Sequence, residues 1–285
     1  MASRLRLARI SSEQTEQAKQ AFSTLRDRFL TPVLTPARVV DGAAIVLEHF
    51  PRGKVLDVGC GQGEVFAVVA TNPSYECSAC DDLRDSWHRT VGPETLLRKM
   101  RELGVAGTQV ENAAEALPFE AEQFAGVFCC DVIEHLHHTP RFLLQEIHRI
   151  LRVGGVVAIG MPNSVNLRKR IDVLRGRTNY VALDKFWNDG LDYRGHVREY
   201  TPRETWTMLE YAGFTPTACY MLDWHVTSRL RGIPLRLYKL AAPLLRTMRD
   251  SYVVVGRKGR SGVMATASAE NGCSSGQKTP TRAIA

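Results

Sequence analysis

The segment VLDVGCGQGEV (residues 55–65) gives the strongest indication of the fold of this chain. An apolar run ends in three glycines at alternating positions, Gly59, Gly61 and Gly63, and a helical pattern follows. Glycine tolerates positive φ and lets a ligand pack against bare backbone. In an open α/β sheet, ligands bind outside the carboxyl ends of the strands. The segment therefore predicts a strand, a tight turn and a helix, with a ligand held at the turn.

The residues around the glycines narrow the kind of ligand. Asp57 lies two residues before the first glycine, where its carboxylate would repel a pyrophosphate but would suit an ammonium or a hydroxyl group. A phosphate-binding loop carries Lys and then Ser or Thr after its glycines, and the dinucleotide fingerprint is G-x-G-x-x-G. Neither pattern occurs here, so the turn predicts a ligand other than a bare nucleotide phosphate.

Six further strand candidates follow the first, and helix-length segments separate the first five. This alternation predicts βαβ units and a parallel sheet with helices on both faces. We therefore expect an α/β fold with a doubly wound, mostly parallel seven-stranded sheet of Rossmann-like type. The candidate strands cover residues 54–59, 75–81, 107–112, 124–131, 156–162, 217–223 and 251–257.

The rest of the chain divides around this sheet. We expect an N-terminal helical cap over residues 1–50, interrupted near Pro32 and Pro36. One domain should cover residues 51–260, with a substrate lid over 163–200 after the fifth strand. The small, polar and aperiodic residues of 261–285 predict a disordered tail.

Composition is that of a soluble globular protein: 285 residues, 44% hydrophobic and 24% charged. We find neither an apolar run long enough to span a membrane nor the apolar core of a signal peptide. The seven cysteines are an odd number, mostly in apolar runs, which favours reduced thiols. We expect a cytoplasmic protein.

Charge is unevenly distributed along the chain. Residues 51–163 contain 10 Lys and Arg against 15 Asp and Glu, whereas residues 164–260 contain 18 against 9. The basic second half suits a polar or anionic acceptor. Its stretch 224–250 has helically spaced leucines and basic residues, which favours either a helix packed on the sheet or peripheral contact with an anionic membrane. A nucleic-acid partner is less favoured.

The glycine segment resembles the first motif of class I S-adenosylmethionine (SAM)-dependent methyltransferases, and further motifs continue the resemblance. The segment AAEALPF (113–119) resembles the family's adenine segment, although Ala113 replaces a frequent Asp. CCDVIEHLHH (129–138) is similar to the small-molecule branch called methyltransferase type 11. The resemblance implies SAM as cofactor and an acid after the second strand that binds both ribose hydroxyls. The implied cofactor-binding residues are Asp57, Gly59, Cys60, Gly61, Gly63, Asp81, Asp82, Ala114, Glu115 and Asp131.

Two histidines are candidate catalytic residues. Methyl transfer depends chiefly on positioning the nucleophile, and a hydroxyl acceptor also needs a base, for which histidine has a suitable pKa. His135 follows the fourth strand, where the family places the methyl group, and His196 follows the expected lid.

A metal site is a second hypothesis for the same region. Asp131, Glu134 and His135 form D-x-x-E-H, which resembles the E-x-x-E-H of relatives that hold a divalent ion with a further histidine. Carboxylates and imidazoles suit such an ion, Mg²⁺, Mn²⁺ or Zn²⁺, which could lower the pKa of an acceptor hydroxyl. The metal set would be Asp131, Glu134, His135 and His196, although Asp131 is one methylene shorter than the family's Glu.

Together these observations predict a SAM-dependent O-methyltransferase that acts on a small polar acceptor. A sugar, a glycolipid head group, another lipid-linked acceptor or a metabolite hydroxyl would fit. Two alternatives stay open: an RNA ribose 2′-O-methyltransferase with a divalent metal, and a non-catalytic SAM-binding or partner protein. Nucleobase methylation is less favoured, because CDVIEH follows the fourth strand where such enzymes carry other signatures. The acceptor and the oligomeric state stay open.

Overall fold

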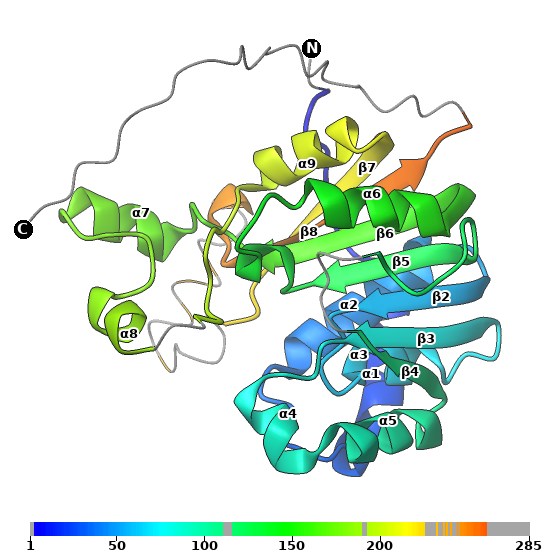
Figure 1. The fold of residues 1–285 in the computed structure, drawn as a ribbon. Helices are drawn as coiled ribbons and strands as arrows, with labels where there is room; N and C mark the ends of the chain where they lie inside the picture. The colour runs from blue at the N-terminus through cyan, green and yellow to red at the C-terminus, as the bar shows by residue number, and fades with distance from the viewer. Residues whose placement is uncertain are drawn as a thin grey trace, which may run out of the picture.

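The computed structural model describes residues 3–110, 116–189, 193–225 and 246–260, with the single positions 232, 236, 238, 240 and 244. An eight-stranded sheet in the order β1-β7-β8-β6-β5-β2-β3-β4 forms the centre of the molecule (Figure 1). Its strands are β1 Leu7–Ala8, β2 Gly53–Val58, β3 Tyr75–Asp81, β4 Val105–Gln109, β5 Phe124–Cys130, β6 Leu151–Pro162, β7 Phe214–Leu222 and β8 Ser251–Lys258.

The doubly wound, mostly parallel sheet is confirmed. Strands β4, β3, β2, β5 and β6 pair in parallel, and β8 is antiparallel to both β6 and β7. The sheet has one strand more than the seven predicted, because the two-residue β1 pairs with β7, with Leu7 opposite Cys219. A two-residue pairing needs only backbone groups and leaves no side-chain pattern to recognise.

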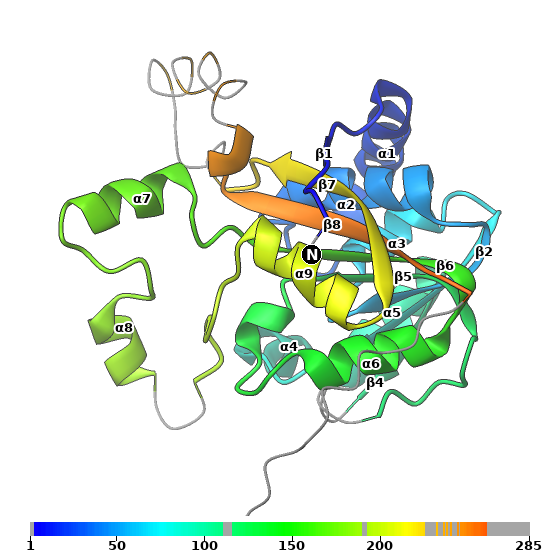
Figure 2. The same ribbon diagram turned by 90° about the horizontal axis from the view of Figure 1, so that it is seen from above.

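Helices cover both faces of the sheet (Figures 1 and 2). Helices α1, α2 and α3 pack in one hydrophobic cluster with Val55 and Phe128. Helices α6 and α9 pack in the other cluster with Leu56 and Val127. Neighbouring residues of one strand thus point to opposite cores, which is why the parallel strands are apolar at successive positions. The helices are α1 Ser12–Leu25, α2 Pro36–His49, α3 Glu64–Val69, α4 Ser86–Val91, α5 Pro93–Glu102, α6 Arg141–Ile150, α7 Leu167–Leu174, α8 Leu183–Asn188 and α9 Pro202–Tyr211, with 3₁₀ turns η1 Arg26–Arg28, η2 Ile133–His135 and η3 Arg246–Met248.

Local sequence explains where the helices nearest the site begin. Helix α2 has Pro36 at its first turn, and the preceding loop 29–35 separates it from η1. Helix α9 starts with a capping box, in which Thr201 accepts from the Glu204 amide and the Glu204 side chain accepts from the Thr201 amide. The segments that precede these two helices, residues 29–35 and 193–200, contribute to the site described below.

No helix in the described part of the chain is long and apolar enough to cross a membrane. The predicted tail over 261–285 and most of the stretch 226–245 lie outside the described residues. Within that stretch, Gly232, Arg236, Leu240 and Leu244 are exposed and Tyr238 is half-buried.

Candidate cofactor and acceptor site

The glycine turn places bare backbone at the end of β2. Gly59 has φ 74° and Gly61 has φ 59°, a conformation that side chains with a Cβ rarely adopt. The amide of Gly59 donates to the carbonyl of Cys80 at 2.8 Å, which ties the turn to β3. A Cβ at Gly59 would overlap the side chain of Val132. The turn therefore requires glycine for both conformation and space.

Asp81 supports this turn from the end of β3. Its carboxylate accepts from the Gly61 amide at 2.9 Å and from the Leu83 amide at 2.8 Å. Burial raises the pKa of Asp81, while these two backbone hydrogen bonds oppose the rise. A carboxylate has about four acceptor positions, so each oxygen keeps a lone pair for a further donor.

Asp82 has a different role from its neighbour. Both of its oxygens accept from Nη2 of Arg194, at 2.9 and 3.0 Å, and Arg194 also pairs with Asp85 at 2.9 Å. Of the two predicted ribose ligands, Asp82 thus holds the segment after α8, whereas Asp81 faces the glycine turn. The structure favours Asp81 for the ribose hydroxyls.

A cavity of about 1460 Å³ opens beside the glycine turn. The loop before α2, the ends of β3 and β5, and residues Tyr193 and Arg194 enclose it. Among the described residues, Asp57, Gly63, Glu134 and His196 lie outside its lining, and Ala113, Ala114 and Glu115 lie outside the described residues altogether. The predicted site residues that line the cavity are Gly59, Cys60, Gly61, Asp81, Asp82, Asp131 and His135.

Asp57 lies beneath the turn rather than in the cavity. Its side chain is buried in β2, and this burial raises the pKa of Asp57 well above its usual value, although Arg38 opposes the rise. The Asp57 side chain therefore lies out of direct contact with the cavity.

Arg38 of α2 is a site residue that sequence reasoning missed. Its Nη1 donates to Oδ2 of Asp131 at 2.9 Å, and both residues line the cavity. Burial opposes the charge of Arg38, but the carboxylates of Asp131 and Glu64 outweigh it, so the pKa of Arg38 is raised. The Oδ1 of Asp131 is buried without a hydrogen-bond partner among the described residues. The sequence around a single Arg at the start of a helix does not indicate whether its side chain points into the protein.

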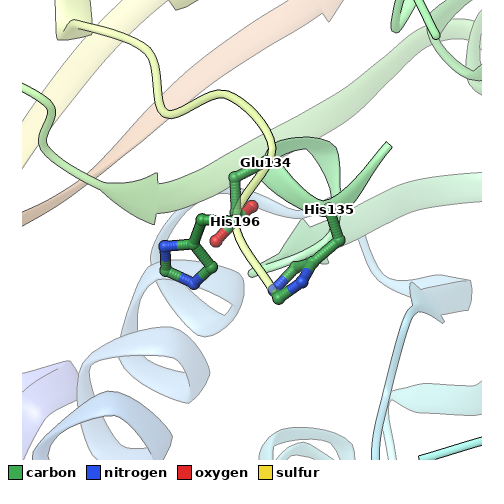
Figure 3. A group of neighbouring side chains, drawn as sticks. All are labelled: Glu134, His135 and His196. Atoms are coloured by element: carbon green, nitrogen blue, oxygen red, sulfur yellow. The ribbon is translucent and has the colours of Figure 1, made fainter. Parts of the chain in front are cut away.

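Glu134, His135 and His196 form one compact group (Figure 3). One potential ligand atom from each lies within 4.8 Å of the others, and the two imidazole rings meet edge to face with centroids 4.8 Å apart. The His196 segment reaches η2 through its backbone, because the amide of Val197 donates to the carbonyl of Glu134 at 2.7 Å. The structure thus brings together three of the four predicted metal ligands.

Asp131, the fourth predicted metal ligand, is not in this group. It adopts a positive φ of 57° and pairs with Arg38. Because Arg38 already neutralises this carboxylate, the expected set Asp131, Glu134, His135 and His196 contracts to three residues.

Glu134 is the most unusual side chain of the group. It is 0% exposed, and both carboxylate oxygens lack a hydrogen-bond partner among the described residues. Burial, and then the charge of Asp131, raise the pKa of Glu134 well above its usual value, although a weak contact with the residue's own backbone amide opposes the rise. A buried polar group without a partner is costly, and a catalytic role or a bound ion is among the reasons for which proteins keep one.

The two histidines are each held by a hydrogen bond of the same ring nitrogen, Nδ1. His135 donates from Nδ1 to the carbonyl of Arg194 at 2.7 Å, since a carbonyl can only accept. His196 Nδ1 bonds Oε1 of Glu199 at 2.9 Å, and Glu199 also pairs with the buried Lys169. Since Nδ1 makes the hydrogen bond in both residues, Nε2 is the ring nitrogen that the described residues leave to accept a proton or bind a metal. Lys169 and Glu199 were missed because they touch the site only through His196.

A family model described as a methyltransferase domain matches residues 16–218. The chain belongs to this family, and it has the class I SAM-dependent methyltransferase fold that the glycine motif predicted. A SAM-dependent methyltransferase of Thermotoga maritima superposes with a TM-score of 0.52 at 15% identity, covering 87% of this chain and 100% of that one. A phosphoethanolamine N-methyltransferase of Haemonchus contortus, solved with SAM, has a TM-score of 0.52 at 16% identity, covering 88% and 58%. These likenesses show the fold.

Curated relatives match over a shorter region. A ribosomal RNA large subunit methyltransferase G of Serratia proteamaculans is 24% identical over 152 residues, which cover 50% of this chain and 39% of that protein. A ubiquinone biosynthesis O-methyltransferase of Rickettsia bellii is 26% identical over 157 residues, 55% of this chain and 59% of that protein. The match thus spans about half the length of these relatives.

Proposed function

We propose that this protein transfers a methyl group from SAM to a hydroxyl oxygen of a small polar acceptor. The observation that carries the proposal is the group of Glu134, His135 and His196 beside a cavity that the glycine turn borders. The acceptor would be a sugar, a glycolipid or other lipid-linked head group, or a metabolite hydroxyl. The ubiquinone-pathway relative, named an O-methyltransferase, supports methylation at oxygen.

The cavity residues fit SAM in three places. Asp81 keeps lone pairs for the two ribose hydroxyls. The Arg38 guanidinium could donate to the carboxylate of the methionine end, and Oδ1 of Asp131, which has no partner among the described residues, could accept from its ammonium. Gly59 and Gly61 let the cofactor approach the backbone. When bound, SAM supplies the electrophilic methyl group. The predicted adenine contacts at Ala114 and Glu115 remain part of the proposal.

His135 is the proposed base. Its Nδ1–H is engaged by the Arg194 carbonyl, so Nε2 can accept the proton that the acceptor hydroxyl loses. Burial, together with nearby His196, lowers the pKa of His135, although the bond to Arg194 opposes this. The imidazole is therefore neutral and able to accept a proton at pH 7.

A divalent cation is the alternative use of the same side chains. Glu134, His135 and His196 would hold a divalent ion such as Mn²⁺ or Zn²⁺, and Mg²⁺ less well because it prefers oxygen ligands. Among the described residues, the Glu134 oxygens have no hydrogen-bond partner, and the printed bonds of both histidines use Nδ1. Such an ion, when bound, acts as a Lewis acid that lowers the pKa of an acceptor hydroxyl. The same group would also serve an RNA ribose 2′-hydroxyl, which is the second candidate acceptor.

The test is an acceptor screen with SAM that carries a radiolabelled methyl group, combined with two variants. His135→Gln and His196→Gln should lose turnover while calorimetry shows near wild-type SAM affinity. His148→Gln is the matched control, since His148 lies on α6 with its ring against Phe214 at 5.0 Å. Wild-type turnover in both site variants would contradict the proposal. Loss of turnover on chelation, reversed by Mg²⁺ or Mn²⁺, would favour the metal over the simple base.

A further inference from the structure

Residues 167–189, which we call the arm, project from the body of the protein. Helices α7 and α8 lie apart from the sheet in both views (Figures 1 and 2). The start of the arm is firmly held: the buried Asn166 side chain accepts from the Lys169 amide at 3.0 Å and donates to the Asn163 carbonyl at 3.0 Å. Lys169 itself is buried against Glu199. Beyond Lys169, the arm is almost entirely exposed.

The exposed part of the arm carries large apolar and aromatic side chains. Leu174 is 86% exposed and Trp187 is 80% exposed, although residues of this size are usually buried. An exposed apolar surface of this kind marks a contact with a protein or a membrane. The large apolar side chains exposed on the arm are Ile171, Val173, Leu174, Tyr180, Leu183, Phe186 and Trp187.

The arm is also basic. It contains six Arg and Lys against three Asp, and Asp172 is shared by Arg168 at 3.1 Å and Arg177 at 3.9 Å. In the part of the chain that the structure describes, no ion pair involves Arg170, Arg175 or Lys185, and all three are exposed. Positively charged residues are thus interspersed along the arm with the exposed apolar ones.

We propose that the arm docks on an anionic phospholipid bilayer. Trp and Tyr combine an apolar ring with a polar tip and suit the membrane–water interface, and the aliphatic side chains can enter the acyl boundary. Arg175 and Lys185 would face lipid phosphates. A folded protein partner would need a complementary surface of about 800 Å² on each side, whereas a bilayer accepts apolar side chains spread over two short helices and a turn.

The position of the arm connects docking with the cavity. The ring of Phe186 packs edge to face against Tyr193 at 4.9 Å, and Tyr193 lines the cavity with Arg194. A bilayer under the arm would therefore lie near the part of the cavity lined by Tyr193 and Arg194, so the acceptor would be an amphiphile whose polar head reaches the cavity from the membrane. This statement about the acceptor rests on the proposed function; docking itself does not require methyl transfer.

Vesicle binding tests the docking directly. The full chain should co-sediment with vesicles of phosphatidylcholine and phosphatidylglycerol, and much less with phosphatidylcholine alone. Leu174→Ser combined with Trp187→Ser should abolish this binding without unfolding the protein, because both side chains are exposed. Tyr211→Ser is the matched control, since Tyr211 is 72% exposed on α9, outside the arm. Equal binding by the arm variant and the wild type would overturn the proposal, as would binding to RNA without binding to vesicles.

A charge variant and fluorescence complete the test. Arg175→Gln with Lys185→Gln should weaken binding about 30-fold, which is about 1 kcal/mol for each charge removed. Lys19→Gln with Lys54→Gln, at exposed lysines of α1 and β2, should change it little. Trp206 and Trp224 are buried, and Trp87→Phe removes the fourth tryptophan of the chain. In this Trp87→Phe background, a blue shift of emission on vesicle addition should disappear when Trp187→Phe is added. A shift that persists in the double variant would contradict insertion of the arm. Turnover of a soluble acceptor by the arm variants separates failure of docking from failure of the proposed chemistry.

Discussion

Replacement of Glu134 by Met should make the protein more stable while it removes the proposed activity. Methionine has a similar length and no polar atoms, and its flexibility lets it fill an irregular space. The change removes two buried oxygens that have no partner among the described residues. Because an unsatisfied buried polar group costs about 1–3 kcal/mol, we expect the free energy of unfolding to rise by about 2 kcal/mol in the absence of metal. Functional sites commonly sacrifice stability in this way.

Glu146 provides the matched control for this prediction. It is also buried, but its carboxylate accepts from the Leu117 amide at 2.9 Å and from Arg149 at 2.8 and 2.9 Å. These bonds lower the pKa of Glu146, with the Arg149 hydrogen bond as the largest cause. Glu146→Met should therefore destabilise the protein by about 2–3 kcal/mol, since it removes charge-assisted bonds and leaves donors unpaired.

Thermal and urea unfolding in the presence of a chelator measure both changes. For a chain of this size, 1 kcal/mol shifts Tm by about 2 °C, so Glu134→Met should raise Tm by about 4 °C and Glu146→Met should lower it. Addition of Mn²⁺ should raise the Tm of the wild type but not that of Glu134→Met. If Glu134→Met lowered Tm in the chelator, Glu134 would have a stabilising partner in solution, and the inference from its orphaned oxygens would be refuted.

Three further predictions concern the cofactor, the base and pH. Asp81→Ala should weaken SAM binding by about 2–3 kcal/mol, and unchanged affinity in calorimetry would exclude Asp81 as the ribose ligand. Glu199→Gln should lower turnover more than SAM affinity, because Glu199 orients His196; equal losses in both measurements would indicate a structural role instead. Burial raises the pKa of Asp41 to about 6, although the hydrogen bond from Trp224 opposes this. The native state therefore binds a proton at Asp41 more tightly than the unfolded state does. The stability that this proton contributes below pH 4 is lost as the pH rises through 6. Between pH 4 and pH 7, the stability of Asp41→Asn relative to that of the wild type should rise by about 2 kcal/mol, and parallel stability curves for the two proteins would contradict this.

Much of the fold could be read from local pattern. The spacing of Gly59, Gly61 and Gly63, and the alternation of apolar strands with helices, predict the parallel sheet and the position of its ligand turn, because each depends on residues adjacent in the chain. Asp81 could be placed at the same edge for the same reason, since the carboxyl ends of neighbouring parallel strands lie together. The two-residue β1 could not be foreseen, because its pairing uses backbone groups alone.

The partners of the charged side chains depend on tertiary packing and could not be predicted from the sequence. Arg38 and Asp131 are 93 positions apart, and no local pattern shows that a helix-start arginine turns inward to neutralise an acid otherwise expected to bind metal. His196 reaches Glu134 because the Val197 amide donates to the Glu134 carbonyl in η2. The compact group therefore depends on a contact between two distant segments, which the spacing of residues in the sequence does not predict. Sequence motifs identify residues whose role depends on the backbone next to them in the chain. The burial and the ion-pair partner of a charged side chain depend instead on all the groups that folding brings around it.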